Sequence, residues 1–333
     1  MIKKFELIKL WFKEYYKSCK SQPEYIEKDE IFYVCGHRGS PVKEIENTIP
    51  SFERALNEGA NSLEMDLCIT KDNEVVLWHD WDPNEPKAIL RESGLEPWVK
   101  YKPHPTSVLD KYRRPVKELT LTEFMKNYDY KRKGTLHPAK AEKPVLKDFF
   151  KWAKDKKQLR NVCFDLKAPE GDKELAVSIL DKLEKLINEF KPHYNFIIET
   201  TEEGVLKAVK KKFPQFSYCL DIEPPLGFIL EPKDYSSVKA AIEHKNNFAL
   251  AFRPRKITIA NYTTFRRIVR YDVRLRSGHN KNHSEFRIEK LLAGIVNKRK
   301  ELKCILGLGV GGIQTDFPAR LRKIAEKAGL RLE

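Results

Sequence analysis

The sequence predicts an α/β fold, an eight-stranded barrel in which parallel strands alternate with helices. Short apolar runs of strand length alternate with longer segments that have helical apolar spacing. The chain has 333 residues, a length that one α/β barrel with insertions commonly reaches. Ionisable residues follow several of the predicted strands, as expected where a barrel builds its active site.

The first 28 residues are expected to form an amphipathic helical segment ahead of the barrel. Phe5, Ile8, Trp11 and Tyr15 recur three or four positions apart, which places them on one face of a helix. This face could lie at a membrane surface, because lysines border its aromatic residues. Packing against the barrel is the interpretation that we prefer.

Nine segments have the composition of β-strands, one more than the barrel requires. They are residues 31–35, 62–69, 74–78, 161–166, 195–198, 216–222, 248–252, 273–275 and 312–314. Helical spacing lies between most of them, as in residues 48–58, 146–155, 173–190 and 201–212. Residues 248–252 and 273–275 compete for the place of the seventh strand.

Residues 81–143 interrupt the alternation of strands and helices. The stretch is rich in charges and contains Pro83, Pro86, Pro97, Pro103, Pro105, Pro115 and Pro138. A regular strand–helix unit does not tolerate this composition. We expect an insertion after the third strand, folded over one mouth of the barrel where lids and substrate loops usually lie. The barrel with this insertion would then span residues 29–333.

The net charge of +15 and the pI near 9.3 predict attraction to anions. A phosphorylated small molecule, an anionic membrane or a nucleic acid would satisfy this charge equally well. Cys35, Cys68, Cys163 and Cys219 lie inside apolar runs, as small hydrophobic residues of a reducing compartment do. Charges interrupt the apolar stretches at the start of the chain, and no run has transmembrane length. These features favour a cytoplasmic protein.

Carboxylates at alternate positions of two predicted strands indicate a metal site. Glu64 and Asp66 point to the same side of one strand, while the residues between them face apolar packing. Asp165 and Lys167 repeat this spacing on another strand, although an internal ion pair without a metal is an alternative there. Two like charges buried together need a cation, and oxygen ligands suit Mg²⁺ or Ca²⁺.

Two histidines follow predicted strands and are candidates for an acid–base pair. His37-Arg38 ends the first strand and His79-Asp80 ends the third. An imidazole titrates near pH 6.5, so one ring can accept a proton while the other donates one. Arg38 suits two phosphate oxygens, and an ion pair with Glu46 is its structural alternative.

The segment after the first strand contains a helix start. Asn47-Thr48 followed by Pro50 is an ordinary beginning of a helix, and we expect Thr48 to cap it. Asn47 is a candidate for a ligand contact.

These segments resemble the signature of the glycerophosphodiester phosphodiesterase family, which belongs to the phospholipase C-like phosphodiesterases. The matching residues are Gly36-His37-Arg38-Gly39, Glu46-Asn47-Thr48, Glu64-Met65-Asp66, His79-Asp80, Phe164-Asp165-Leu166-Lys167 and the run from Gly309 to Pro318. The resemblance covers roughly residues 31–322 apart from the insertion. It implies a TIM-like barrel.

The resemblance also implies the roles of the site residues. Glu64, Asp66 and Asp165 would hold one divalent cation, Mg²⁺ or Ca²⁺. His37 and His79 would act as general acid and base. Two cations, Arg38 and Lys167, would bind the substrate phosphate, with Glu46, Asn47 and Asp80 in support.

The resemblance further implies hydrolysis of a glycerophosphodiester to an alcohol and glycerol phosphate. The family usually has Glu at the position of Asp165, and its late Trp-Thr-Val-Asn-like segment is replaced here by residues 276–280.

Two alternatives stay open. One is a phosphodiesterase that acts on lysophospholipids at a membrane surface. The other is a protein that binds nucleic acid through basic runs at residues 253–256 and 266–276, or a barrel that binds a phosphorylated ligand without turnover. No recognised nucleic-acid module is present, so we expect no nucleic-acid partner. The oligomeric state cannot be inferred.

Overall fold

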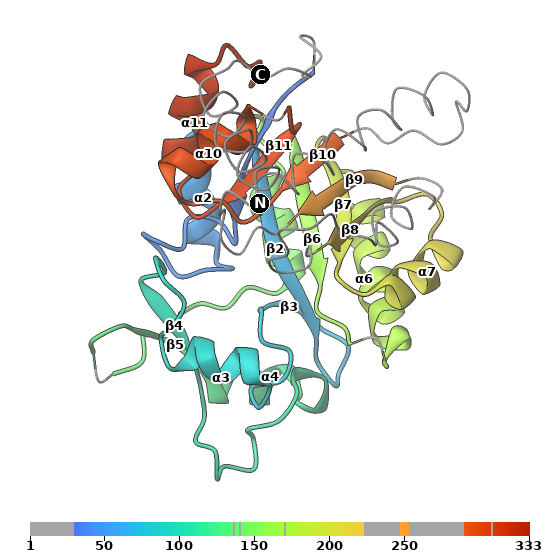
Figure 1. Ribbon diagram of the computed structural model, residues 1–333. Coiled ribbons are helices and arrows are strands. Elements are labelled where there is room, and N and C mark those ends of the chain that lie inside the picture. Colours follow the sequence, from blue (N-terminus) through green and yellow to red (C-terminus); the bar gives the residue numbers. More distant parts are fainter. Residues whose placement is uncertain are drawn as a thin grey trace, which may run out of the picture. The chain divides into compact units, whose positions relative to one another are not determined.

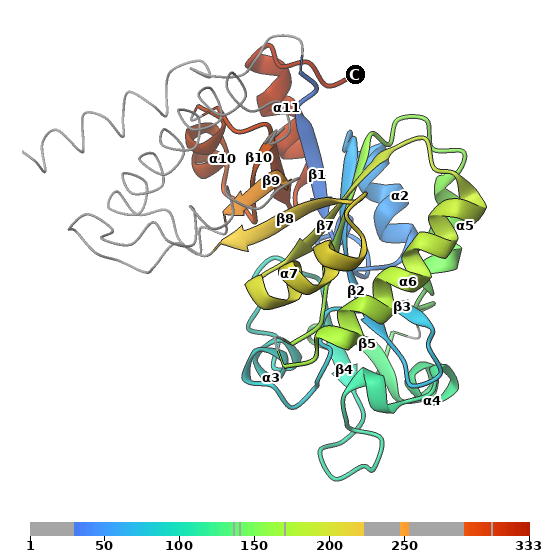
Figure 2. The same ribbon diagram turned by 90° about the vertical axis from the view of Figure 1, so that its right-hand side faces the viewer.

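The computed structural model describes residues 30–135, 137–139, 141–169, 171–222, 247–252, 290–307 and 309–333 (Figures 1 and 2). The expected N-terminal helix, the strand at residues 273–275, the segment 276–280 and both basic runs lie outside these residues. The chain forms two compact units. The first unit comprises Cys35–Phe216 with Asp316–Pro318, and the second comprises Ser217–Thr315 and Ala319–Glu333 together with the chain up to Val34.

Parallel strands form the sheet of the first unit. Strands β1 (Tyr33–His37), β2 (Ser62–Ile69), β6 (Asn161–Leu166) and β7 (Asn195–Thr200) pair side by side in that order. The helices that follow them are α2 (Ile49–Asn57), α5 (Leu146–Ala153), α6 (Lys173–Phe190) and α7 (Glu203–Lys212). This is the alternation that the apolar spacing predicts.

Aromatic residues join the helices to one face of this sheet. Phe149 of α5 contacts Phe52 of α2 at 5.6 Å between ring centroids and Phe164 of β6 at 6.2 Å, both edge to face. All three side chains are fully buried. The alternate residues of β6, including Asp165, therefore face the opposite side of the sheet.

The prediction of a third parallel strand is wrong. Strand β3 (Val75–Leu77) runs antiparallel to β2, with Ile69 opposite Val75 and Leu67 opposite Leu77. Only a short turn joins the two strands, whereas a parallel crossover needs about a dozen residues. The hairpin accounts for the surplus strand, and it returns the chain beside Asp66, whose carbonyl oxygen accepts from the Trp78 N–H.

The second unit also contains parallel strands. They are β8 (Ser217–Ile222), β9 (Asn247–Phe252), β10 (Lys290–Ala293) and β11 (Gly312–Thr315), with α10 (Arg299–Leu306) between the last two and α11 (Pro318–Lys327) after them. Strand β9 confirms the prediction at residues 248–252. Strand β10 was not predicted, because only four residues form it and the first is a lysine.

The stretch 81–143 forms a small substructure of its own instead of a strand–helix unit. It contains α3 (Pro86–Glu92), β4 (Tyr101–Pro105), the 3₁₀ turn η1 (Val116–Glu118), α4 (Leu121–Asn127) and β5 (Tyr128–Arg132). Strands β4 and β5 pair antiparallel with each other. Pro103 lies in the middle of β4 and Pro105 at its end, and prolines are tolerated there because each of the two strands is an edge strand.

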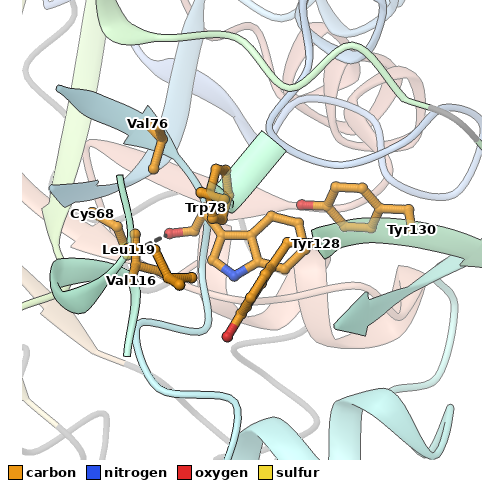
Figure 3. Close-up of a cluster of buried hydrophobic side chains, with 8 residues drawn as sticks. Cys68, Val76, Trp78, Val116, Leu119, Tyr128 and Tyr130 are labelled. Atoms are coloured by element: carbon orange, nitrogen blue, oxygen red, sulfur yellow. Dashed lines mark hydrogen bonds between the residues drawn. The ribbon is translucent and has the colours of Figure 1, made fainter. Parts of the chain in front are cut away.

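An aromatic cluster attaches this substructure to β2 and β3 (Figure 3). Trp78 lies at its centre, with ring centroids 4.7 Å from Tyr130, 5.5 Å from Phe124 and 5.9 Å from Tyr128. The indole N–H donates to the Asp80 carbonyl oxygen at 3.1 Å. Trp78 immediately precedes His79 and Asp80 in the chain. Its packing therefore fixes the backbone position from which these two side chains extend.

Replacing Trp78 with alanine is expected to lower the free energy of unfolding by about 3–5 kcal/mol, because the change leaves a large cavity in a buried cluster. Urea unfolding of the variant measures this loss. Trp98→Ala is the matched control, since the Trp98 side chain is half exposed. Equal losses in the two variants would contradict the central place of Trp78.

Candidate active site

The predicted ligands meet on the face of the sheet opposite the helices. His37 of β1 lies opposite Glu64 of β2, and Asp66 of β2 lies opposite Asp165 of β6. All four side chains are buried. One oxygen atom from each of Glu64, Asp66 and Asp165 lies within 4.8 Å of the others. The i, i+2 spacing on two neighbouring strands therefore gathers three carboxylates.

The ammonium group of Lys167 lies among these carboxylates. Its Nζ atom is 2.8 Å from Asp66 Oδ1 and 2.6 Å from Asp165 Oδ2. Burial raises the pKa of Asp66, but Lys167 and Arg38 outweigh this effect and hold that pKa well below its usual range. Lys167 thus pairs with Asp165, as in the internal ion pair that the sequence left open as an alternative, and with Asp66 as well.

Glu64 has the opposite behaviour. Burial, together with the neighbouring Asp66 and Asp165 carboxylates, raises the pKa of Glu64 well above its usual value. Its Oε2 atom accepts a hydrogen bond from the Arg38 backbone N–H at 2.9 Å. A further positive charge near Glu64 would therefore be strongly favourable.

Arg38 is buried and surrounded by acids. Its Nη1 atom lies 2.8 Å from Glu46 Oε2, and its Nε atom lies 3.1 Å from Asp66 Oδ2. Arg38 has a φ of 52° and Gly39 a φ of 87°, so the chain turns sharply at the end of β1. A side chain at Gly39 would collide with Ser51. The predicted ion pair with Glu46 is present, and the glycine makes the turn that forms it possible.

Asn47 orients one of the acids. Its Nδ2 atom donates to Asp66 Oδ2 at 2.8 Å, and its Oδ1 atom accepts from the Asp66 backbone N–H at 3.2 Å. Thr48 caps α2 by accepting from the Ser51 N–H at 3.4 Å, as predicted. Asn47 therefore acts on the acidic cluster in this structure.

Each histidine is supported by an aspartate. His37 Nδ1 donates to Asp316 Oδ1 at 2.7 Å, and its Nε2 lies 3.9 Å from Glu64 Oε2. Burial and the charge of Arg38 lower the pKa of His37, although Asp316 opposes this change. The ring is therefore held by one nitrogen while the other faces the acidic cluster.

His79 repeats this arrangement just after β3, which pairs with the last residues of β2. His79 Nδ1 donates to Asp80 Oδ1 at 2.6 Å, and burial raises the pKa of Asp80. Its Nε2 is buried and finds no hydrogen-bond partner among the residues that the structure describes. Burial and the cations Arg38 and Arg91 lower the pKa of His79 well below 6.5. A neutral ring with an unused nitrogen is available to exchange a proton.

An arginine from the 81–143 stretch completes the network. Arg91 of α3 is buried, and its Nε atom lies 3.0 Å from Asp80 Oδ1. Its two Nη atoms form ion pairs with Glu46 and Glu96. Arg91 therefore contacts both Asp80, which accepts from His79, and Glu46, which pairs with Arg38.

Sequence reasoning missed Asp316, Arg91 and Glu96. Asp316 directly follows β11, so its place after a strand was an available signal. Arg91 and Glu96 lie in the proline-rich stretch, where no periodic pattern marks an inward-facing residue. Their inward position depends on the fold of the whole stretch.

The residues present fit a hard divalent cation. The three clustered residues offer only carboxylate oxygens, which Mg²⁺ and Ca²⁺ prefer, and burial together with the neighbouring carboxylates raises the pKa of Glu64. Two aspartate-backed imidazoles beside these acids suit proton transfer at an ester of phosphoric acid. The class of protein that this fold and site define is a hydrolase of phosphoric diester bonds.

Sequence comparison gives the particular family. Residues 37–320 match the glycerophosphoryl diester phosphodiesterase family, and the chain belongs to it. A glycerophosphodiester phosphodiesterase of Caldanaerobacter subterraneus is 26% identical over 300 residues, covering 89% of this chain and 98% of the relative. Lysophospholipase D GDPD3 of Mus musculus is 23% identical over 303 residues, covering 88% of this chain and 82% of the relative.

Solved structures agree on the fold. A glycerophosphoryl diester phosphodiesterase of Silicibacter pomeroyi matches with a TM-score of 0.66 at 17% identity, covering 96% of this chain and 99% of that one. A phosphodiesterase of Oleispira antarctica, solved with sn-glycerol-3-phosphate, matches with a TM-score of 0.59 at 16% identity, covering 88% and 96%. The predicted TIM-like α/β class is confirmed.

His79→Asn is expected to reduce the loss of unfolding free energy that the metal-free protein undergoes as the pH falls. The folded-state pKa of His79 is lowered, so the folded protein does not take up the proton that the unfolded chain binds near pH 6.5. The stability that this difference provides is present above about pH 6.5 and is lost as the pH falls. Urea unfolding between about pH 5.5 and 7.5 in EDTA measures it.

The exposed His193 provides the matched control. His193→Asn should keep the wild-type dependence of unfolding free energy on pH. A slope for His79→Asn equal to that of the wild type would show that His79 titrates normally in the folded protein.

Proposed function

We propose that this protein is a glycerophosphodiester phosphodiesterase that produces an alcohol and glycerol phosphate. The observation that carries the proposal is the pair of buried histidines, each held at Nδ1 by an aspartate. They lie at the end of β1 and just after β3, which both pair with the strand that carries two of the three clustered carboxylates. Membership in the family supports it, and so do the names of the relatives.

In this proposal Glu64, Asp66 and Asp165 hold one divalent cation, Mg²⁺ or Ca²⁺. The bound cation would supply positive charge that stabilises the additional negative charge of the transition state. Asp165 is one methylene shorter than the Glu that the family resemblance leads us to expect, and one of its carboxylate oxygens still lies within 4.8 Å of oxygens of Glu64 and Asp66, so it could serve as the third ligand. Asn47 keeps Asp66 in position through its two hydrogen bonds.

His37 and His79 are proposed to exchange protons through Nε2. One ring deprotonates a water molecule or a neighbouring substrate hydroxyl, and the other protonates the leaving alcohol. Asp316 and Asp80 fix the ring orientations and stabilise the protonated rings. Arg38 and Lys167 provide fixed positive charge for the phosphate oxygens.

A lysophospholipid-directed phosphodiesterase is the second candidate. The relative named lysophospholipase D supports it, because this chain aligns with 82% of that protein. The chemistry at phosphorus would be the same, and only the alcohol and acyl contacts would differ. A barrel without turnover is disfavoured, because both proposed proton carriers keep their supporting aspartates.

We also propose that residues 29–333 form the catalytic barrel, with 81–143 as its insertion, in a cytoplasmic protein that can meet a membrane peripherally. Among the described helices, none has the length and apolar character needed to cross a bilayer.

Hydrolysis assays test the proposal directly. With glycerophosphocholine and related diesters, Mg²⁺ or Ca²⁺ should support activity and EDTA should abolish it. His37→Asn and Glu64→Gln should each lower kcat by about 10²- to 10⁴-fold, since each removes a proton carrier or a metal ligand. The exposed Glu189→Gln is the matched control and should leave kcat unchanged. Activity that survives chelation would exclude the metal.

Arg91→Met is expected to lower kcat by about 10- to 100-fold with a small change in KM, because the partner that holds Asp80 behind His79 is lost. Arg91→Lys should restore only part of the rate, since an ammonium group cannot contact three carboxylates in the same plane. The pH dependence of kcat should also shift.

Arg113→Met is the matched control for Arg91. Arg113 is a second buried arginine of the 81–143 stretch, and it contacts Glu92 and backbone carbonyl groups there. Its loss should lower stability and leave the pH dependence of kcat unchanged. Identical kinetic effects in the two variants would mean that Arg91 acts only through the fold.

A further inference from the structure

The exposed large hydrophobic side chains of the described residues all lie in one segment of the chain. They are Ile89, Leu90, Leu95, Trp98, Val108 and Leu109. Leu109 is 94% exposed and Val108 is 74% exposed. Single exposed hydrophobic residues are common on any protein, but their confinement to 21 consecutive positions is a sign of an interaction surface.

Helix α3 presents two of these residues outward. Ala88 and Arg91, three positions apart, are buried on its inner side, while Ile89 and Leu90 between them are about half exposed. Leu95 follows at the end of the helix, where its N–H donates to the Leu90 carbonyl oxygen. The outer side of α3 is therefore apolar.

Arg113 holds the loop with Val108 and Leu109 against the ends of α3. Its guanidinium group donates to the Thr106 carbonyl oxygen at 3.0 Å, to the Pro83 carbonyl oxygen at 3.1 Å and to Glu92 Oε2 at 2.7 Å. Figures 1 and 2 show this loop projecting outward beyond α3 and β4. The two most exposed hydrophobic residues thus lie at a fixed protruding tip.

The charge around this tip favours an anionic partner. Residues 86–111 contain five Lys and Arg against three Asp and Glu. Lys87 is exposed on α3, and at the tip the exposed Asp110 is followed by the exposed Lys111. A lipid interface accepts protruding apolar side chains without a complementary pocket and attracts nearby cations. A protein partner would instead need a pocket shaped to receive Leu109.

We propose that the α3 surface and the tip, together residues 86–111, dock on a bilayer that contains anionic phospholipid. The inner side of the same helix carries Arg91, which contacts Glu46 and Asp80. Docking therefore places the proposed active site one helix away from the lipid head groups. The consequence for substrates, access to phosphodiesters held in a membrane, rests on the proposed function, whereas the docking itself does not.

Vesicle co-sedimentation of the full chain tests the proposal. The wild type should bind vesicles of phosphatidylcholine with phosphatidylglycerol more tightly than vesicles of phosphatidylcholine alone, and added salt should weaken binding. Val108→Ser/Leu109→Ser should bind about tenfold more weakly or worse, since two side chains no longer enter the interface. Val108→Leu/Leu109→Val keeps both apolar groups and is the matched control.

Three results would overturn the docking proposal. The wild type could fail to bind either vesicle, or the serine variant could bind as tightly as the wild type, which would place the contact elsewhere. Sedimentation without lipid could also reveal a wild-type oligomer that the serine variant lacks, which would make the surface an interface between copies of this chain.

Activity assays separate this proposal from the proposed function. The serine variant should hydrolyse a soluble glycerophosphodiester at the wild-type rate and lose activity only on lysophospholipid presented in vesicles. The wild type could bind vesicles through Val108 and Leu109 and yet hydrolyse no substrate; this result would support docking and count against the proposed phosphodiesterase. Hydrolysis by a wild type that does not bind vesicles through these residues would support the phosphodiesterase and count against docking.

Discussion

The structure depends on the compensation of buried carboxylates by three buried or nearly buried cations. Glu64 and Asp66 lie on one strand with almost no exposure, and burying such charges without partners would cost several kcal/mol each. Arg38 and Lys167 provide the compensation by contacting Asp66 from two directions. Removal of either cation would leave the buried carboxylates with less positive charge around them, so the residues that carry the cations matter to stability as well as to the site.

Ion pairs between a buried cation and several acids also join the 81–143 stretch to the site. Arg91 enters from α3 and contacts three acids, Glu46, Asp80 and Glu96. The aromatic cluster around Trp78 fixes the other connection, because Trp78 directly precedes His79. One ionic and one apolar attachment therefore hold the second histidine. The stretch that the sequence predicts as an insertion over one mouth of the barrel is thus part of the support for the candidate acid–base pair.

The two-residue period of β-strands predicted which carboxylates of the site lie together. Glu64 and Asp66 had to share a face, and parallel neighbours then brought Asp165 and His37 beside them. The direction of β3 could have been predicted as well, since the link from β2 is too short for a crossover. Asp316 and Arg91 could not be assigned in this way, because their positions depend on contacts over hundreds of residues or on an irregular loop.

The charge balance of the site favours a bound cation. Among the described residues, the acids in contact are Glu46, Glu64, Asp66, Asp80, Glu96, Asp165 and Asp316, and the cations are Arg38, Arg91 and Lys167. Protonation of Glu64, whose pKa burial and the neighbouring carboxylates raise well above its usual value, offsets only part of this excess of acids. A divalent cation held by Glu64, Asp66 and Asp165 would offset more of it. That cation would compete with Lys167 for Asp66 and Asp165, so the ion pairs of Lys167 do not conflict with its proposed contact with the phosphate.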